Sequence, residues 1–384
     1  MTGDLTYQDI PNYQNISNHR KVPKIPDLHT QRIARISNYC SDPKRKEKER
    51  VYKNTYMFKT QRKNYFYEKF NIPYCKVPKV GCTFMMEMFQ TFEQGHIPKF
   101  VSRSRLAIHS LTNGHKQKHI EGIRTLSTVR DPYSRLYSAY VDKILLPNMY
   151  FTSIRIRKMN VDASKLNLNN KTLCANDISF QQFLDFIVTT AQSTDRMNSH
   201  WAPINEICHF CETNNYMIIQ QETFGDDVMD FMTSLNVSAD EFQAVKQLMT
   251  TKRIAATIPG IVDVVLKKQH TTKEIKACLS RTDVLKKLWL SFQIQGYISE
   301  QEPFPDVAFS KIAGKTSFDL FSDIMVRAAN HLSLTKEECR RQRKKYLTSA
   351  YREISAGTLE GIKQIYRADF ELFNYDTSPP VTSD

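Results

Sequence analysis

The chain contains the stretch Cys75-Lys76-Val77-Pro78-Lys79-Val80-Gly81-Cys82-Thr83, which joins two apolar segments of different periodicity. Residues 71–77 have the composition of a short strand, and Pro78 ends it because proline cannot donate to a ladder. Between Phe84 and Phe92 the apolar residues recur at helical spacing. The stretch therefore predicts a strand, a tight turn and a helix in immediate succession.

The turn has the chemistry of a phosphate-binding loop. Gly81 allows a sharp change of backbone direction, and the helix after it starts with free N–H groups and the positive end of its dipole. Lys79 adds a positive charge and Thr83 a hydroxyl. The loop lacks the first glycine and the Gly-Lys pair of a Walker A loop, and no Mg²⁺-binding acid can be assigned near it, which disfavours kinases and NTPases. The alternative is an ordinary strand–loop–helix joint.

A second turn of the same kind follows the apolar strand predicted at residues 125–129. Asp131 is a good N-cap, and Pro132 occupies the first helical position, where its missing N–H costs nothing. Arg130 ends the strand, where a guanidinium is costly unless it meets an anion, and Ser138 lies on the helix with access to the same place. The alternative is an Arg130–Asp131 ion pair with Ser138 as a packing residue. Two such turns together favour one ligand with two separated anionic groups.

Two strand–turn–helix units in series predict an α/β fold in which a parallel, P-loop-like sheet is flanked by helices. A further strand is predicted at residues 216–219, an apolar helix from Phe180 to Val188, and a closing amphipathic helix at residues 365–373. We expect residues 1–60 to be an N-terminal arm, irregular to residue 45, with a basic helix over about 43–59. Residues 61–384 would form the main domain, with 238–350 as a helical insertion or elaboration.

The net charge of +14, from 54 Lys and Arg against 40 Asp and Glu, indicates an anionic partner. Two basic runs, at residues 44–50 and 340–345, are not interleaved with aromatic residues as a single-strand nucleic-acid platform would be, so no nucleic-acid partner is predicted. No run of about 18 apolar residues is present, so no membrane-spanning helix is predicted.

The eight cysteines permit disulfides without requiring them. Cys208 and Cys211, with His200 upstream, permit a zinc site, but a single C-x₂-C motif is weak because structural zinc takes four ligands. We favour structural or disulfide-bonded cysteines in an oxidising compartment and expect no metal. Three Asn-X-Ser/Thr sequons, at Asn15, Asn170 and Asn236, support a secretory route weakly.

The two turns together resemble the Golgi carbohydrate sulfotransferases, in the branch that holds the HNK-1, chondroitin/dermatan 4-O- and GalNAc-4-O-sulfotransferases. The stretch from His200-Trp201-Ala202-Pro203-Ile204 to Cys211 and the closing Tyr366 to Tyr375 are also similar to that branch. The resemblance covers about residues 70–236 and 361–376. It implies the fold of the sulfotransferases that depend on 3′-phosphoadenosine 5′-phosphosulfate (PAPS), which work without a metal.

By this resemblance, PAPS is the co-substrate that the two turns bind. The first turn would hold the 5′-phosphosulfate, and the second would hold the 3′-phosphate. The implied residues are Lys79, Val80, Gly81, Cys82 and Thr83 for the 5′-phosphosulfate, Arg130 and Ser138 for the 3′-phosphate, and Asp131 and Pro132 for the shape of the second turn.

The expected reaction is transfer of the sulfuryl group to a glycan hydroxyl, on GalNAc or uronic acid, in a glycosaminoglycan or glycoprotein glycan. Lys79 would neutralise the leaving phosphate oxygen. His109, between the two turns, is the first candidate for the general base, and His200 is the second. The basic surplus favours an acidic acceptor. Phe84-Met85-Met86-Glu87 departs from the family pattern, which puts contacts from that helix in question.

The resemblance also implies a Golgi protein on the lumenal side, held by a type II membrane anchor that this sequence does not show. A catalytically degenerate family member that binds a glycan or nucleotide is one alternative function. A nucleotide- or phosphate-transferring enzyme is another, and it would need a metal-binding carboxylate near Lys79. The acceptor sugar and the oligomeric state stay open at this stage.

Overall fold

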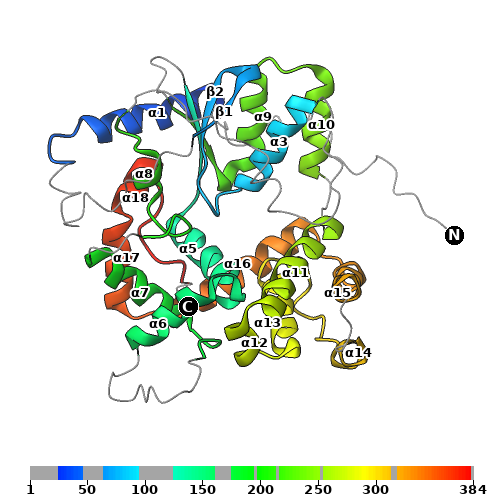
Figure 1. The fold of residues 1–384 in the computed structure, drawn as a ribbon. Helices are drawn as coiled ribbons and strands as arrows, with labels where there is room; N and C mark the ends of the chain where they lie inside the picture. Colours follow the sequence, from blue (N-terminus) through cyan, green and yellow to red (C-terminus); the bar gives the residue numbers. More distant parts are fainter. Residues whose placement is uncertain are drawn as a thin grey trace.

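The computed structural model describes residues 25–45, 64–94, 124–160, 174–193, 197–212, 216–250, 254–312 and 318–381. In Figure 1 a small sheet with helices on both faces forms the upper part of the molecule. Helices alone form the lower part, with one group toward the left and another toward the right.

The sheet contains β1 (Asn64–Tyr67), β2 (Ile72–Cys75), β3 (Thr125–Val129) and β4 (Tyr216–Gln220), in that spatial order. Strands β2, β3 and β4 are parallel, which confirms the predicted α/β class, and β1 is an antiparallel edge strand that the sequence did not predict. Because parallel strands end at one edge of a sheet, the loops after β2, β3 and β4 meet there.

Helices α3 (Cys82–Gln94), α9 (Phe224–Ser234) and α10 (Ala239–Thr250) cover one face of the sheet. Their apolar stripes bury Met88, Phe89 and Phe231 against Tyr74 of β2. Helix α10 was predicted to open the C-terminal helical insertion, but it packs against α3 and belongs to this layer instead. The helix predicted after the first turn is confirmed, but residues 85–92 are all buried, so α3 is enclosed on every side and not on one face alone.

The opposite face carries α1 (Ile25–Ser41) and, below it, α5 (Pro132–Tyr140), α7 (Phe180–Gln192), α8 (Ile204–Cys208), α17 (Ala356–Ile365) and α18 (Arg367–Phe373). The expectation of an irregular arm is wrong for residues 25–41, because α1 packs on β4 and α18. The basic helix predicted over residues 43–59 falls, past Arg45, outside the part of the chain that the structure describes.

The helices between residues 254 and 331 form a layer with a hydrophobic core of its own, which includes Val262, Leu285, Trp289 and Phe321. It contains α11 (Ile254–Thr271), α12 (Lys273–Cys278), α13 (Arg281–Ile294), α14 (Asp306–Ile312) and α15 (Asp319–His331). Helix α16 (Lys336–Arg352) joins this layer to the main body, because it contacts α13 and α5 and its Tyr351 is buried in the core of the main body. Helix α6 (Tyr150–Asn160) packs on α7 and belongs to the main body.

Helices α11 to α16 lie in the stretch 238–350, or just beyond it, that the sequence analysis expected to be helical, and the reading of that stretch as an insertion or elaboration stays a prediction. This helical layer contacts the main body through η3 (Pro147–Met149), the π-helical turn η2 (Val141–Leu145) and α5.

Three disulfides join distant segments: Cys40–Cys211, Cys75–Cys208 and Cys174–Cys278. Both thiols of the C-x₂-C motif are thus bonded to other cysteines, which excludes the zinc interpretation for them and confirms the disulfide one. None of the described helices is both long enough and apolar enough to cross a membrane.

Candidate functional site

The first turn is shaped by two residues with left-handed backbone conformations, Lys79 (φ +72°) and Gly81 (φ +88°). Glycine suits the φ of +88°, which strains any residue with a Cβ, and a Cβ there would also stand 2.7 Å from Oε1 of Gln221, so that side chain would have to move. The carbonyl of Pro78 accepts from Arg135 Nε at 3.1 Å, and that of Lys79 accepts from Arg130 Nη1 at 3.2 Å. The two guanidinium groups therefore offset the partial negative charges of two carbonyl oxygens that would otherwise repel an anion.

The other predicted donor-binding residues of this turn differ in what they can offer. The side chains of Val80 and Cys82 are buried in the core, so they can contact a ligand through their backbone only. Thr83 is half-buried in the first turn of α3. Next to it, Phe84 packs edge-on against Phe224, with ring centroids 5.2 Å apart. Residues 84–87, which depart from the family pattern, therefore pack in the core: residues 85–87 are buried, and Phe84 contacts Phe224.

The second turn has the predicted local geometry. Asp131 caps α5 by accepting from the backbone N–H of Ser134 at 2.7 Å, and Pro132 is the first helical residue. Arg130 donates to Ser134 Oγ at 3.0 Å, and Ser138 lies one helical turn beyond Ser134 on the same face of α5. The structure thereby aligns Arg130 and Ser138 along one side of the helix.

Besides Asp131, a carboxylate that the sequence analysis did not single out, Glu222, lies near Arg130. Glu222 accepts from the backbone N–H of Asp131 at 3.0 Å and from Tyr375 Oη at 2.8 Å. Burial and, less strongly, Glu222 raise the pKa of Asp131 to about 6, against the hydrogen bonds from Ser134 that lower it. Burial also lowers the pKa of the Arg130 guanidinium, with Glu222 and Asp131 opposing that effect. Arg130 is therefore held in a partly dehydrated place where an anion would stabilise its charge.

The π-helical turn after α5 brings the carboxylate of Asp142 into contact with the ammonium group of Lys79. Asp142, in η2, accepts from Lys79 Nζ at 2.6 Å and lies 3.2 Å from Lys143 Nζ. Asn148, in η3, donates from Nδ2 to the Asp142 carbonyl at 2.8 Å and to its Oδ1 at 3.2 Å. π-Turns often mark functional sites, because the extra residue turns side chains that follow it toward a new direction.

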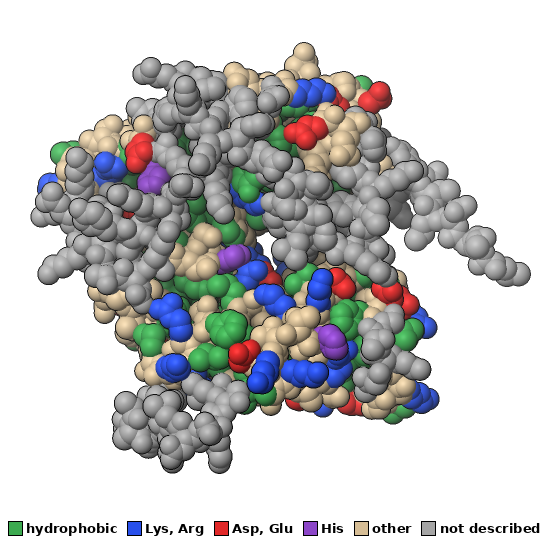
Figure 2. All heavy atoms as spheres, viewed as in Figure 1, with side chains coloured by type: hydrophobic (Ala, Val, Ile, Leu, Met, Phe, Trp, Pro, Cys, Tyr) green, Lys and Arg blue, Asp and Glu red, His purple; other side chains and the backbone are tan. Residues whose placement is uncertain are grey.

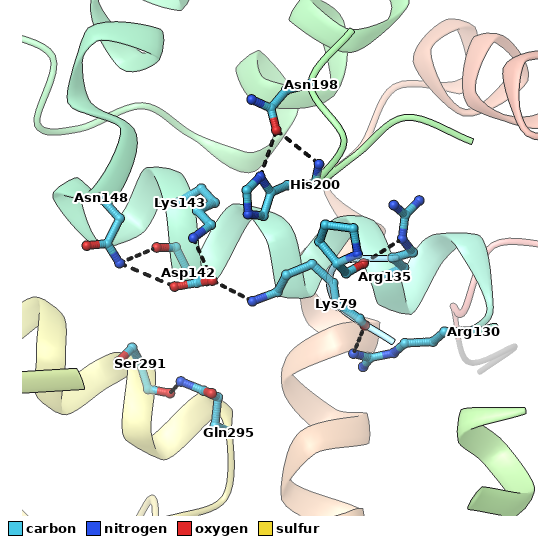
Figure 3. Close-up of polar contacts among 11 residues, drawn as sticks. Lys79, Arg130, Arg135, Asp142, Lys143, Asn148, Asn198, His200, Ser291 and Gln295 are labelled. Carbon is cyan, nitrogen blue, oxygen red and sulfur yellow. Dashed lines mark hydrogen bonds and ion pairs between the residues drawn. The ribbon is translucent and has the colours of Figure 1, made fainter. Parts of the chain in front are cut away.

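His200 lies beside this group, as Figure 3 shows. Oδ1 of Asn198 accepts from the backbone N–H of His200 at 3.0 Å and lies 2.7 Å from its Nδ1. Because the same oxygen accepts both bonds, the ring proton is on Nδ1 and Nε2 has the free lone pair. Burial, followed by the charges of Lys143 and Lys79, lowers the pKa of His200 to about 3. The imidazole is therefore neutral at physiological pH.

The His200 segment is held from several sides by residues distant in sequence. Arg135, fully buried, donates to the carbonyls of Ser199 at 2.9 Å and Ala202 at 2.6 Å. Tyr366 donates to the carbonyl of Trp201. Asp369, whose pKa burial raises to about 6, accepts from the first two N–H groups of α8 at 2.6 and 2.8 Å. The closing motif of the chain thus supports this segment.

The structure brings the two predicted turns and His200 close together, as Figure 3 shows for Lys79, Arg130 and His200. Figure 2 shows a hollow between the upper and lower parts of the molecule, with Lys and Arg side chains along its margin. The Cys75–Cys208 disulfide also joins the strand before the first turn to the end of α8. His109 is among the residues that the structure does not describe, so its proximity stays a prediction. The sequence analysis did not identify four residues of this site, because no local sequence pattern points to them: Arg135, Asp142, Asn198 and Glu222.

A sequence model described as the Sulfotransferase family matches residues 62–288. Carbohydrate sulfotransferase 9 of Homo sapiens is 28% identical over 193 residues, covering 46% of this chain and 42% of that protein. Carbohydrate sulfotransferase 11 of Danio rerio is 26% identical over 215 residues, covering 50% and 59%. Carbohydrate sulfotransferase 12 of Mus musculus is 23% identical over 204 residues, covering 45% and 48%.

The chain spans about half the length of the curated relatives it matches. No solved structure matches it. The resemblance to carbohydrate sulfotransferases that the two turns indicate is confirmed by these relatives. Because the family match extends over more than half of the chain and includes the Lys79 turn, the Arg130 turn and His200, the chain belongs to the sulfotransferase family.

Proposed function

We propose that this protein transfers the sulfuryl group of PAPS to a hydroxyl group of a glycan. One observation carries the proposal. Two cationic turns lie close to a neutral histidine in a chain of the sulfotransferase family, and Arg130 and Arg135 contact backbone carbonyls of the first turn. PAPS supplies the activated sulfuryl group and has anionic groups at both ends of its ribose. The two separated cationic turns fit that pattern, with Lys79 at one and Arg130 at the other.

The residues of the first turn would bind the 5′-phosphosulfate through backbone N–H groups and the Lys79 ammonium. Lys79 would neutralise the negative charge that develops on the phosphate oxygen when the bond from that oxygen to sulfur breaks. In the free protein Asp142 holds this ammonium at 2.6 Å, so the lysine is already extended across the turn. Arg130, with Ser138, would bind the 3′-phosphate and fix the orientation of the nucleotide.

His200 is the general base that we infer from the geometry. Its Nε2 lone pair would take the proton of the acceptor hydroxyl while the oxygen of that hydroxyl forms its bond to sulfur. The Asn198 contact fixes the tautomer that this step needs. Lys143 and Lys79 lower the pKa of the imidazole, so an anionic donor that neutralises them would raise it and make His200 a better base. His109 stays the alternative base.

The test is label transfer from radiolabelled PAPS to a panel of desulfated glycans, with PAPS binding measured in parallel. Arg130→Ala should weaken PAPS binding about 10- to 100-fold, because it removes a charge-assisted contact. His200→Ala should lower kcat by about 10²- to 10⁴-fold while PAPS binding is kept. Arg340→Ala, which removes an exposed arginine of α16, is the matched control and should behave as wild type.

Each result distinguishes the alternatives. If His109→Ala loses turnover and His200→Ala keeps it, His109 is the base. PAPS binding without any labelled glycan would favour a catalytically degenerate binding protein. No PAPS binding at all would contradict the proposal.

The acceptor and the compartment follow from charge and redox chemistry. The net charge of +14 favours an acidic glycan, with GalNAc or uronic acid as the sulfated sugar. Three disulfides favour an oxidising compartment, and with the named relatives they support the Golgi lumen. No metal is required by this reaction scheme.

A further inference from the structure

Arg130, which would bind the 3′-phosphate of the donor, has two carboxylates beside it. Asp131 follows it in the chain, and Glu222 accepts a hydrogen bond from the backbone N–H of Asp131 at 3.0 Å. A phosphate monoester carries about two negative charges at neutral pH. Arg130 therefore offers the phosphate one positive charge for two negative ones, at a place where two carboxylates already compete for that charge. A second cation would strengthen the binding of a phosphate there.

Helix α16 packs along α5, the helix that begins at this turn (Figure 1). Tyr351, near the end of α16, donates to the carbonyl of Tyr133 at 2.8 Å, and the centroids of the two rings are 5.2 Å apart. Burial and, more weakly, Tyr346 raise the pKa of Tyr137, so Tyr346 lies near that residue. The two helices therefore run in opposite directions along their contact, and the earlier turns of α16 lie toward the later turns of α5.

Arg343 extends the face of α16 that packs on the main body. Arg343, Leu347 and Tyr351 are four residues apart, so they lie on one side of the helix. Tyr351 is buried in the core of the main body and Leu347 packs against that core, whereas Arg343 is exposed. The turn after α13 lies against α16 at this level, since a Cβ on Gly296 would stand 3.4 Å from Arg343 Nε. Arg343 therefore stands where the packed face ends and where a ligand can reach its guanidinium.

The charge of Arg343 acts on Arg130. Burial lowers the pKa of the Arg130 guanidinium, Glu222 and Asp131 oppose this effect, and Arg343 lowers the pKa further. Arg343 has no carboxylate partner among the residues that the structure describes, and its Nε donates to the carbonyl of Cys339 in its own helix at 3.3 Å. Its terminal nitrogens can therefore donate to a ligand. An anion bound between the two guanidinium groups would relieve their repulsion.

We propose that Arg343 binds the 3′-phosphate of the donor together with Arg130 and Ser138, and makes the site selective for nucleotides that carry this phosphate. The inference rests on the proposed function, to which it adds a residue that the family resemblance did not indicate. Arg343 supplies the second positive charge, and a guanidinium can donate two hydrogen bonds to one phosphate. Helix α16, which joins the helical layer to the main body, would thus take part in donor recognition.

The test compares 3′,5′-ADP with 5′-AMP, which differ only in the 3′-phosphate. Titration calorimetry measures the binding of each nucleotide to the whole chain. Arg343→Gln should weaken 3′,5′-ADP binding about tenfold, because it removes one charge-assisted contact, and should leave 5′-AMP binding unchanged. Arg343→Lys, which keeps the charge but not the planar pair of donors, should lose less. The 5′-AMP affinity also reports whether each variant is folded.

Arg341→Gln is the matched control, because Arg341 is an exposed arginine of α16 that lies two residues away, nearly on the opposite side of the helix from Arg343. It should bind both nucleotides like wild type. The inference is overturned if Arg343→Gln keeps the wild-type affinity for 3′,5′-ADP, if it weakens both nucleotides by the same factor, or if Arg341→Gln weakens 3′,5′-ADP binding as much. If wild type itself does not prefer 3′,5′-ADP to 5′-AMP, the proposed donor fails, so the two failures give different results.

Discussion

One half-buried histidine connects the proposed chemistry of the site to the stability of the fold. His200 has an ordinary pKa of 6.5 and a folded-state pKa of about 3, because burial and two lysines disfavour its charged form. Between these two values the unfolded chain carries a proton on the imidazole that the folded chain does not. The free energy of unfolding contributed by this residue therefore decreases as the pH falls from 6.5 toward 3.

Replacing this imidazole should remove that pH dependence. From pH 7 to pH 5 we expect the stability of His200→Gln to rise relative to wild type by about 2 kcal/mol, at about 1.4 kcal/mol per pH unit below 6.5. Urea unfolding at both pH values measures the difference. Asp131 and Asp369, whose pKa values are raised, are present in both proteins and cancel. If the difference in unfolding free energy between His200→Gln and wild type is the same at pH 7 and pH 5, the lowered pKa of His200 is contradicted. The control is His270→Gln, which changes an exposed histidine.

At the scale of elements, α1 is attached to the sheet by one buried arginine. Arg32 donates to Asp227 Oδ2 at 2.8 Å, to the carbonyl of Ile218 at 3.1 Å and to Gln220 Oε1 at 3.0 Å. Arg32 and Asp227 are 6% and 7% exposed. Removing one partner of a buried pair leaves the other charge uncompensated, which is costlier than the net value of the pair.

Arg32→Met should therefore lower the free energy of unfolding by about 3–5 kcal/mol. Arg35→Met, one turn away on the same helix and half-buried, should cost much less. The double variant Arg32→Met/Asp227→Asn should recover part of the loss, because the unpaired charge is gone. Urea denaturation followed by circular dichroism measures all three. A loss below about 1 kcal/mol for Arg32→Met would show that α1 is held by its apolar contacts and the Cys40–Cys211 disulfide instead.

At the scale of the whole molecule, the disulfides connect parts that the sequence keeps far apart. Cys174–Cys278 joins the segment before α7 to α12, and so links the main body to the helical layer across 104 residues of sequence. Such a crosslink restricts the unfolded chain strongly, since long loops have the largest closure entropy.

The variant Cys174→Ala/Cys278→Ala should be about 2–5 kcal/mol less stable than wild type. Cys339→Ser, which changes a thiol outside any disulfide, is the control. Reduction of wild type, which breaks all three disulfides, should cost more stability than the double variant loses, and reduction of the double variant should cost the remainder. Thermal and urea unfolding with and without reductant measure these differences. Equal stability of double variant and wild type would mean that the layer is joined by packing alone.

Local sequence signals were sufficient to predict the elements that carry the proposed donor site. The strand at 125–129 was predicted with its observed bounds, and Asp131 and Pro132 start α5 as their cap chemistry requires. These signals are interactions between residues a few positions apart, so they can be read from the chain. The helix α1 was missed because the prolines at 23 and 26 suggested an irregular segment. Proline is compatible with the first turn of a helix, and α1 starts at Ile25.

The rest of the site depends on contacts between residues that no spacing relates. Asp142 reaches Lys79 only because a π-helical turn follows α5, and Arg135 binds carbonyls of two loops because the parallel strands end at one edge. Composition and motifs thus specified the sheet, its two anion turns and the family. Only the tertiary structure determines which histidine and lysine side chains face those turns. Burial and distance set the pKa values and the partners of these side chains, and neither burial nor distance is a property of local sequence.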